Sequence, residues 1–176
     1  MTNDLFKRIG AAATRFGRSV YGLPAQKAIV ETRKLVGFSL LGADYVLPLN
    51  EVNEILELPP CTKLPRVKSW VRGLANVRGR LLPIVNFADF LGGTLSSSIR
   101  DLRVLVLDID GVYVGIVVDR VQGIRSVAMD RYQSQLNESA LGAFTDGSFI
   151  IEDNITLPLF SPRKLIQDNQ FMAVSV

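Results

Sequence analysis

The 176-residue sequence contains no histidine and only one cysteine, Cys61. A disulfide framework and a Cys/His zinc site are therefore excluded, and so are the Ser-His-Asp and Cys-His mechanisms, which need a histidine base. No Gly-x-Gly-x-x-Gly or Gly-x4-Gly-Lys-Ser/Thr phosphate loop occurs, so the sequence predicts neither a nucleotide cofactor nor a metal. We assign Asp108, Asp110 and Asp119 to strand ends and turns rather than to catalysis. These absences favour a binding protein over an enzyme.

The sequence also lacks an apolar run of the roughly 20 residues that a membrane-spanning helix needs. Charged residues interrupt the first turns where a signal peptide would be apolar, so we expect a cytoplasmic protein. The net charge of +3 is unevenly distributed, because residues 1–34 contain seven Lys and Arg against two Asp and Glu, whereas the remainder has a net charge of −2. A nearly neutral body argues against a nucleic-acid-binding face on the domain itself.

An N-terminal extension, residues 1–33, precedes the main domain. Within it, residues 5–20 place apolar side chains at helical spacing with basic side chains between them, which predicts an amphipathic helix weakened by Gly10 and Gly17. We favour a helix that packs on its own domain. The alternative is a helix that docks on a partner or on an anionic membrane surface.

The pattern changes at Leu35 to short apolar runs separated by turn residues, which is typical of an all-β sandwich or barrel with about ten strands. Residues 51–58 predict a helical turn that runs into a strand, and Ala88–Leu91 a short helical turn. Residues 66–73 predict a short helix with Trp70 turned inward. Tight turns are expected at residues 42–44, Asp110-Gly111, Asp146-Gly147 and Asp153-Asn154. Ser161-Pro162 begins a short C-terminal helix, after which the last residues are expected to fray.

One stretch, Gly73–Phe87, organises the rest of the chain. Two apolar strands flank a turn at Arg78-Gly79-Arg80, and Gly79 can adopt the positive φ that such a turn needs. Pro83 has no N–H, which predicts that its strand lies at an edge or carries a bulge. The turn presents guanidinium groups, which do not titrate and therefore suit binding better than acid–base chemistry.

The same stretch resembles a known family. Asn76-Val77-Arg78-Gly79 followed by Leu82-Pro83-Ile84-Val85 is similar to the Asn-Leu-Arg-Gly…Pro-Val/Ile-Val motif of CheW-like chemotaxis coupling proteins. Trp70-Val71-Arg72-Gly73 upstream and Val114–Asp119 downstream also match, in family order, within roughly residues 34–162. Val77 replaces the usual leucine, and Asn86 stands where aspartate is common. Trp70 and the Gly22-Leu23-Pro24-Ala25 segment most resemble the coupling proteins of type IV pilus (twitching motility) chemosensory systems.

The strand pattern alone does not distinguish one β-sandwich from two β-barrels, but the resemblance does. It implies two five-stranded SH3-like β-barrels, packed together along a shared apolar seam within residues 34–170.

The resemblance also implies a function. Members are non-enzymatic adaptors of two-component chemotaxis signalling, which join the cytoplasmic tip of a chemoreceptor to the regulatory domain of a CheA-like histidine kinase. By motif position, Val52, Glu54, Arg78 and Gly79 match receptor-binding positions and Gly73 matches a kinase-binding position. Such a protein meets the membrane only indirectly, through the receptor array, and binds no nucleic acid.

Two alternatives remain at the level of sequence. Between Lys63 and Arg80 lie six Lys and Arg and no acidic residue, so a small nucleic-acid-binding barrel could use this stretch. Against it, only Trp70 supplies an aromatic side chain for base stacking there. The second alternative concerns Arg78, which could merely brace its own loop instead of contacting a partner.

Overall fold

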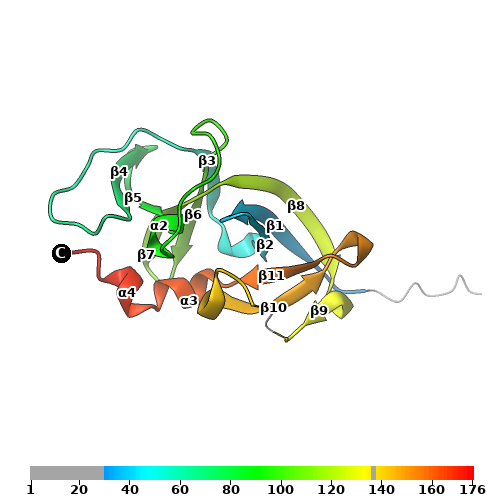
Figure 1. Cartoon of the computed structure of the whole chain (residues 1–176). Helices are drawn as coiled ribbons and strands as arrows, with labels where there is room; N and C mark the ends of the chain where they lie inside the picture. The colour runs from blue at the N-terminus through cyan, green and yellow to red at the C-terminus, as the bar shows by residue number, and fades with distance from the viewer. Residues whose placement is uncertain (1–29, 136–137) are drawn as a thin grey trace, which may run out of the picture.

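The computed structural model describes residues 30–135 and 138–176, so the predicted helix of residues 5–20 lies outside the described residues. Within them, eleven strands form two sheets that lie side by side (Figure 1). The strand order is β8-β1-β2-β11-β10-β9 in the six-stranded sheet and β3-β6-β7-β5-β4 in the five-stranded sheet. The predicted all-β class is confirmed, and the two predicted five-stranded barrels correspond to these two sheets, one of which has six strands instead of five.

Each sheet draws its strands from different parts of the chain. The six-stranded sheet contains β1 (Thr32–Leu40), β2 (Ala43–Pro48), β8 (Arg120–Ala128), β9 (Tyr132–Gln133), β10 (Thr145–Ile150) and β11 (Thr156–Phe160). The five-stranded sheet contains β3 (Glu54–Glu57), β4 (Val71–Val77), β5 (Arg80–Asn86), β6 (Arg103–Ile109) and β7 (Val112–Val118). The short helices are η1 (Leu49–Glu51), α2 (Phe87–Phe90), η2 (Met129–Arg131), η3 (Gly142–Phe144), η4 (Glu152–Asn154), α3 (Pro162–Ile166) and α4 (Asn169–Met172). No helix among the described residues is long and apolar enough to cross a membrane.

Both faces of the central strands are buried, because alternate side chains enter different cores. In β6, Val104 and Val106 belong to a core inside the five-stranded sheet, whereas Leu105 and Leu107 belong to a second core that also contains residues of β1 and β2. A third core lies inside the six-stranded sheet and includes Leu35 and Phe149. The second core is the apolar seam between the sheets, and it explains why these strands are continuous apolar runs.

Three hairpins turn through two consecutive residues of positive φ, the geometry of a type I′ turn. The pairs are Leu41-Gly42 (φ 54° and 77°), Arg78-Gly79 (φ 53° and 83°) and Asp110-Gly111 (φ 50° and 83°). The predicted turns at Arg78-Gly79 and Asp110-Gly111 are confirmed. The first hairpin turns one residue earlier than the predicted 42–44, because β2 already begins at Ala43.

Asp119 has the structural role that its position between β7 and β8 predicts. It is 2% exposed, and its carboxylate accepts hydrogen bonds from the backbone N–H groups of Leu41 (3.1 Å), Ser96 (2.6 Å) and Ser97 (2.8 Å). These bonds tie the β1–β2 turn and the loop before β6 to the centre of the molecule, so Asp119 is not available as a catalytic acid.

Two predicted elements are wrong. Residues 66–73 form no helix; they are a loop with turns at residues 65–66 and 69–70 that enters β4 at Val71. Asp146-Gly147 makes no hairpin turn, because β10 runs through it as a bulge whose flanking residues, Thr145 and Ser148, both pair with β11. The predicted turn at Asp153-Asn154, in η4, is confirmed and connects β10 to β11.

Pro83 and the chain end also differ from expectation. β5 is an interior strand, so the edge position is wrong, and the bulge lies on the neighbouring β4 between Val71 and Gly73. Pro83 is tolerated because β7 begins to pair with β5 only at Ile84. The last residues do not fray, since Val67 and Ser175 form a β-bridge.

Candidate functional site

The β4–β5 turn is stabilised from within. The backbone N–H of Gly79 donates to the Asn76 side-chain oxygen at 2.8 Å, and Val77 pairs with Arg80 across the hairpin. A side-chain acceptor three residues before the turn glycine fixes the conformation without help from the core. The first two residues of the Asn-Val-Arg-Gly motif therefore position the last two.

Arg78 projects outward from this turn, with its side chain 81% exposed. One terminal guanidinium nitrogen lies 2.6 Å from a carboxylate oxygen of Glu54, whose side chain is only 21% exposed. β3 and β4 are the two edges of the five-stranded sheet, so this ion pair joins the opposite edges of a curled sheet. Guanidinium has five N–H donors, and most of those of Arg78 remain free for a partner. The structure thus brings together two of the predicted receptor-binding residues.

The other two predicted receptor-binding residues differ in exposure. Gly79 is exposed in the turn, and a Cβ there would meet no atom within 4 Å. Val52, between η1 and β3, is half-buried and packs on the core between the sheets. Val52 therefore offers a partner less surface than Arg78 or Gly79, and it positions the strand that presents Glu54.

The Arg80 side chain makes two contacts within the folded chain. Its guanidinium donates to the Asp108 carboxylate at 2.9 Å and lies 3.5 Å from the centre of the Tyr113 ring. A cation over an aromatic face gains electrostatic stabilisation in addition to the ion pair. Two arginines of one turn thus have different environments: each pairs with a carboxylate, but the Arg78 side chain is the more exposed, at 81% against 57% for Arg80.

Leu81, an exposed apolar residue beside this turn, was not predicted as a site residue from the sequence. Leu81 is 62% exposed whereas Leu82 is fully buried. The period of two along β5 allows only one of these adjacent leucines to face the core. Two adjacent leucines in a strand indicate that one of them is exposed, but which one is exposed depends on the register of β5 against β4.

Gly73, the predicted kinase-binding residue, lies apart from the turn and is buried. Its φ is 138°, and a Cβ on it would lie 2.2 Å from the carbonyl oxygen of Thr62. Thr62 and Leu74 exchange backbone hydrogen bonds of 2.8 and 2.9 Å at this contact. The absence of a Cβ at Gly73 therefore allows the loop of residues 58–70 to close onto β4.

That loop borders a groove of about 620 Å³, which we call the basic groove because three of its lining residues are Lys63, Lys68 and Arg72. Cys61 also lines it and donates a weak hydrogen bond to the Pro59 carbonyl. Burial raises the pKa of the Cys61 thiol above its ordinary value, and the nearby Arg72 guanidinium opposes this shift. A raised pKa makes the thiol a poor nucleophile at neutral pH.

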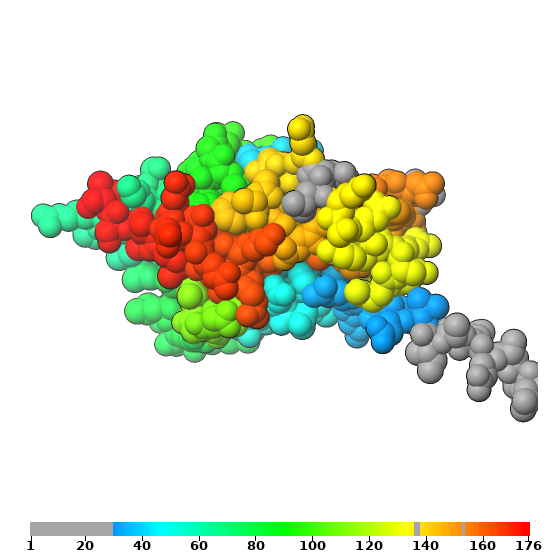
Figure 2. Space-filling model, turned by 90° about the horizontal axis from the view of Figure 1, so that it is seen from below, coloured from blue at the N-terminus to red at the C-terminus, as the bar shows by residue number. Residues whose placement is uncertain are grey.

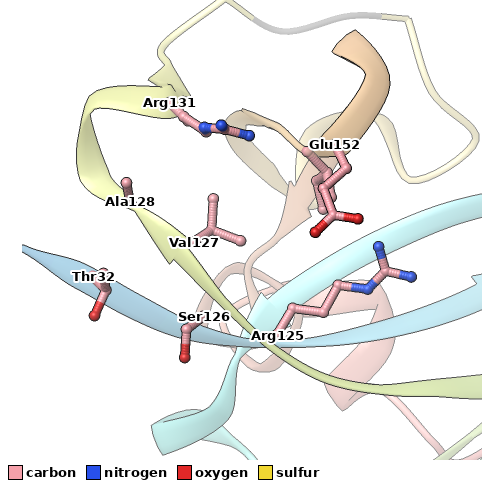
Figure 3. A pocket seen from close by; sticks show the side chains of 8 residues that line it. Thr32, Arg125, Ser126, Val127, Ala128, Arg131 and Glu152 are labelled. Atoms are coloured by element: carbon pink, nitrogen blue, oxygen red, sulfur yellow. The ribbon is translucent and has the colours of Figure 1, made fainter.

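A second hollow, of about 560 Å³, lies at the free edge of the six-stranded sheet between β8 and η4. Figure 3 shows the side chains of Arg125 and Glu152 turned toward one another across it. Arg131 also lines it, so the hollow has charges of both signs. It contains none of the predicted site residues. No group of three or more acidic, Cys or His residues in the described ranges is placed to bind a metal ion.

Comparisons with known proteins agree with the fold and the motif. A family model described as a CheW-like domain matches residues 34–170. Protein PilI of Pseudomonas aeruginosa is 42% identical over 164 residues, which cover 92% of this chain and 91% of that protein. Chemotaxis protein CheW of Rhizobium meliloti is 30% identical over 96 residues, covering 54% and 62% of the two chains.

A solved structure shares the fold. The scaffolding protein TtCheW from Thermoanaerobacter tengcongensis superimposes with a TM-score of 0.69 and 24% identity, over 80% of this chain and 96% of that one. Residues 34–170, which the family model matches, include strands of both sheets, the β4–β5 turn with its Asn-Val-Arg-Gly motif, and Gly73. From these matches together, the protein described here belongs to the CheW-like family.

Proposed function

We propose that this protein is a non-enzymatic adaptor that couples a methyl-accepting chemoreceptor to a CheA-like histidine kinase in a type IV pilus chemosensory pathway. Residues 34–170 are the coupling domain in this proposal, and residues 1–33 are an extension. Membership of the CheW-like family and the similarity to PilI support the assignment. The pilus pathway rests on that similarity and on the motif variants around Trp70.

The observation that supports the receptor site is the position of Arg78. A cation that is 81% exposed, on a turn stabilised by Asn76, is ready to bind a carboxylate on a receptor helix. Leu81, on the same hairpin, supplies exposed apolar surface that would exclude water from such a contact. Glu54 limits the freedom of the guanidinium before binding, which reduces the entropy lost in the complex.

The test is Arg78→Glu, assayed by binding to a receptor signalling fragment. We expect affinity to fall at least about tenfold, or roughly 1.4 kcal/mol, because the variant repels the receptor carboxylate. Arg131→Glu, an equal charge change at an exposed position on η2, is the matched control and should bind normally. Circular dichroism should show both variants folded. Normal binding by folded Arg78→Glu would refute the receptor site.

A nucleic-acid-binding function is separated from this one by a single measurement. Fluorescence anisotropy with a short oligonucleotide should show no binding that weakens steeply with salt. Two of the six basic residues of the Lys63–Arg80 stretch, Arg78 and Arg80, already pair with carboxylates in the folded chain. Salt-dependent oligonucleotide binding, together with no binding to a receptor fragment, would overturn the adaptor assignment.

A further inference from the structure

The basic groove has an uncompensated positive charge. Lys63, Lys68 and Arg72 form no ion pair with any residue in the described part of the chain. The sequence has no Asp or Glu between residues 58 and 88, so no acidic neighbour along the chain offsets them. In this respect the groove differs from the hollow beside β8, where Glu152 faces Arg125.

The wall of the basic groove also has apolar residues. Leu58, Pro60, Leu64 and Val67 line it, and Ile99, on the loop before β6, is 74% exposed at its margin. Its volume of about 620 Å³ falls within the range of about 300–1,000 Å³ that is usual for ligand-binding clefts. Apolar walls with unpaired cations favour an occupant that has carboxylates beside an aliphatic side chain.

The C-terminal residues bind directly to the loop that forms this wall. The N–H of Lys68 donates to the carbonyl of Val174 at 2.9 Å, and the N–H of Val176 donates to the carbonyl of Arg66 at 3.1 Å. Val67 and Ser175 form the β-bridge between these two bonds. Figures 1 and 2 show the chain end beside the loop at one end of the molecule.

An aromatic contact anchors the same segment. Phe171, in α4, is 3% exposed, and its ring stacks on Trp70 with centroids 5.8 Å apart and an interplanar angle of 10°. The Phe171 ring also meets the edge of Phe90 at 5.2 Å. The Asp168 side chain accepts a bond from the N–H of Phe171 at 2.8 Å and caps α4. The segment is therefore fixed at Phe171 and pairs with the loop beyond it.

We propose that the C-terminal residues 171–176 are a clamp that holds the 58–70 loop in the shape of a docking surface for an acidic segment of the partner kinase. This inference rests on the proposed function, in which Gly73 belongs to the kinase side. It reassigns the contact from buried Gly73 to the basic groove that Gly73 allows to form. The match to the family ends at residue 170, so the clamp lies beyond the shared domain.

In this proposal, the clamp orders the 58–70 loop before the partner binds. A loop that is already ordered loses less conformational entropy when a partner binds, so its affinity is higher. Without the clamp, the described long-range backbone bonds of the loop to the sheet lie at two places, between Thr62 and Leu74 and where the N–H of Asn86 donates to the Trp70 carbonyl at 2.7 Å. The residues between these two places, which include Lys63 and Lys68, would then have more conformational freedom to lose in the complex.

Val176→Pro tests the clamp, because proline removes the N–H that binds the Arg66 carbonyl. Val176→Ala keeps that N–H and is the matched control, and removal of residues 174–176 abolishes both bonds. The first readout is the rate at which Cys61, the only cysteine, reacts with a disulfide reagent. Loss of the clamp should open the basic groove and raise this rate about threefold or more, while Val176→Ala should leave it unchanged. Equal rates in all variants would overturn the clamp.

The second readout is binding to the regulatory domain of a CheA-like kinase from the same organism. We expect about tenfold weaker binding for Val176→Pro and for Lys68→Glu, and normal binding for Val176→Ala. If the clamp variants react faster at Cys61 but bind the kinase domain normally, the docking surface is refuted. If the unaltered protein does not bind the kinase domain, the kinase half of the proposed function fails, and with it the docking surface, whereas the thiol rates still decide the clamp.

Discussion

The β4–β5 turn and the 58–70 loop are both basic segments of the five-stranded sheet, but they are stabilised in opposite ways. The turn depends on Asn76, three residues before the Gly79 that it binds. The loop depends on β4 and on the chain end, through the contact of Thr62 with Gly73 and the bridge between Val67 and Ser175. The turn keeps its shape by itself, whereas the loop keeps its shape only while the rest of the molecule is in place.

This difference has a consequence for the two interfaces of an adaptor. A site on the turn should respond mainly to changes of its own residues, such as Arg78. A site on the loop should respond to changes far away in the sequence, because remote residues determine its conformation. Substitutions that perturb the two segments separately therefore test whether the turn and the loop are stabilised independently.

The largest effect is expected from Gly73→Ala. Its Cβ would lie 2.2 Å from the Thr62 carbonyl oxygen, and the φ of 138° is unfavourable for alanine. We expect a loss of about 3–5 kcal/mol in the free energy of unfolding, from overpacking and backbone strain together. Urea denaturation measures this loss.

Gly79→Ala is the matched control for Gly73→Ala. Its φ is 83°, but a Cβ there meets no atom within 4 Å. The strain alone should cost about 1 kcal/mol. Similar losses at both glycines would show that the 58–70 loop yields easily, and the contrast between the segments would be lost.

A smaller effect is expected from Asn76→Ala. The substitution removes the acceptor for the Gly79 N–H, an exposed hydrogen bond of 2.8 Å. We expect the unfolding free energy to fall by about 0.5–1.5 kcal/mol, with faster hydrogen exchange at the turn but not at residues 58–70. Exchange that also accelerates in the 58–70 loop would contradict the independence of the two segments.

The smallest effect is expected from Glu54→Gln. It removes the charge that pairs with Arg78, but the guanidinium is 81% exposed and therefore well solvated. Such pairs contribute about 0–1 kcal/mol. The free energy of unfolding should therefore change by less than about 1 kcal/mol, both at low and at high salt. A loss above about 2 kcal/mol would mean that the ion pair closes the sheet and does more than orient Arg78.

Local chemistry predicted much of the fold. Asp110-Gly111 and Arg78-Gly79 turn as expected because their preferences for positive φ act within two residues. The helical turn expected at Ala88–Leu91 is α2, one residue earlier, and the Asn86 side chain caps it by accepting from Asp89. Of the candidate site, the outward position of Arg78 was predicted correctly.

The two wrongly predicted elements lie where a remote partner overrides a local preference. Asp146-Gly147 has the composition of a turn, yet pairing with β11 on both sides keeps it inside β10. Residues 66–73 have apolar side chains at helical spacing, but Trp70 packs on Phe171 and Val67 pairs with Ser175. The ion pair between Glu54 and Arg78 was likewise unpredictable, because it depends on how far the sheet curls.

By itself, the sequence determined that this protein is rich in β-strands, lacks histidine and a second cysteine, and has a glycine turn that presents an arginine. Those properties follow from residue type and from preferences within a few residues. Only the tertiary structure decided that Gly73 lies buried against the 58–70 loop, and that the chain end pairs with that loop. Both depend on contacts between residues 11 and more than 100 positions apart, which local preferences do not encode.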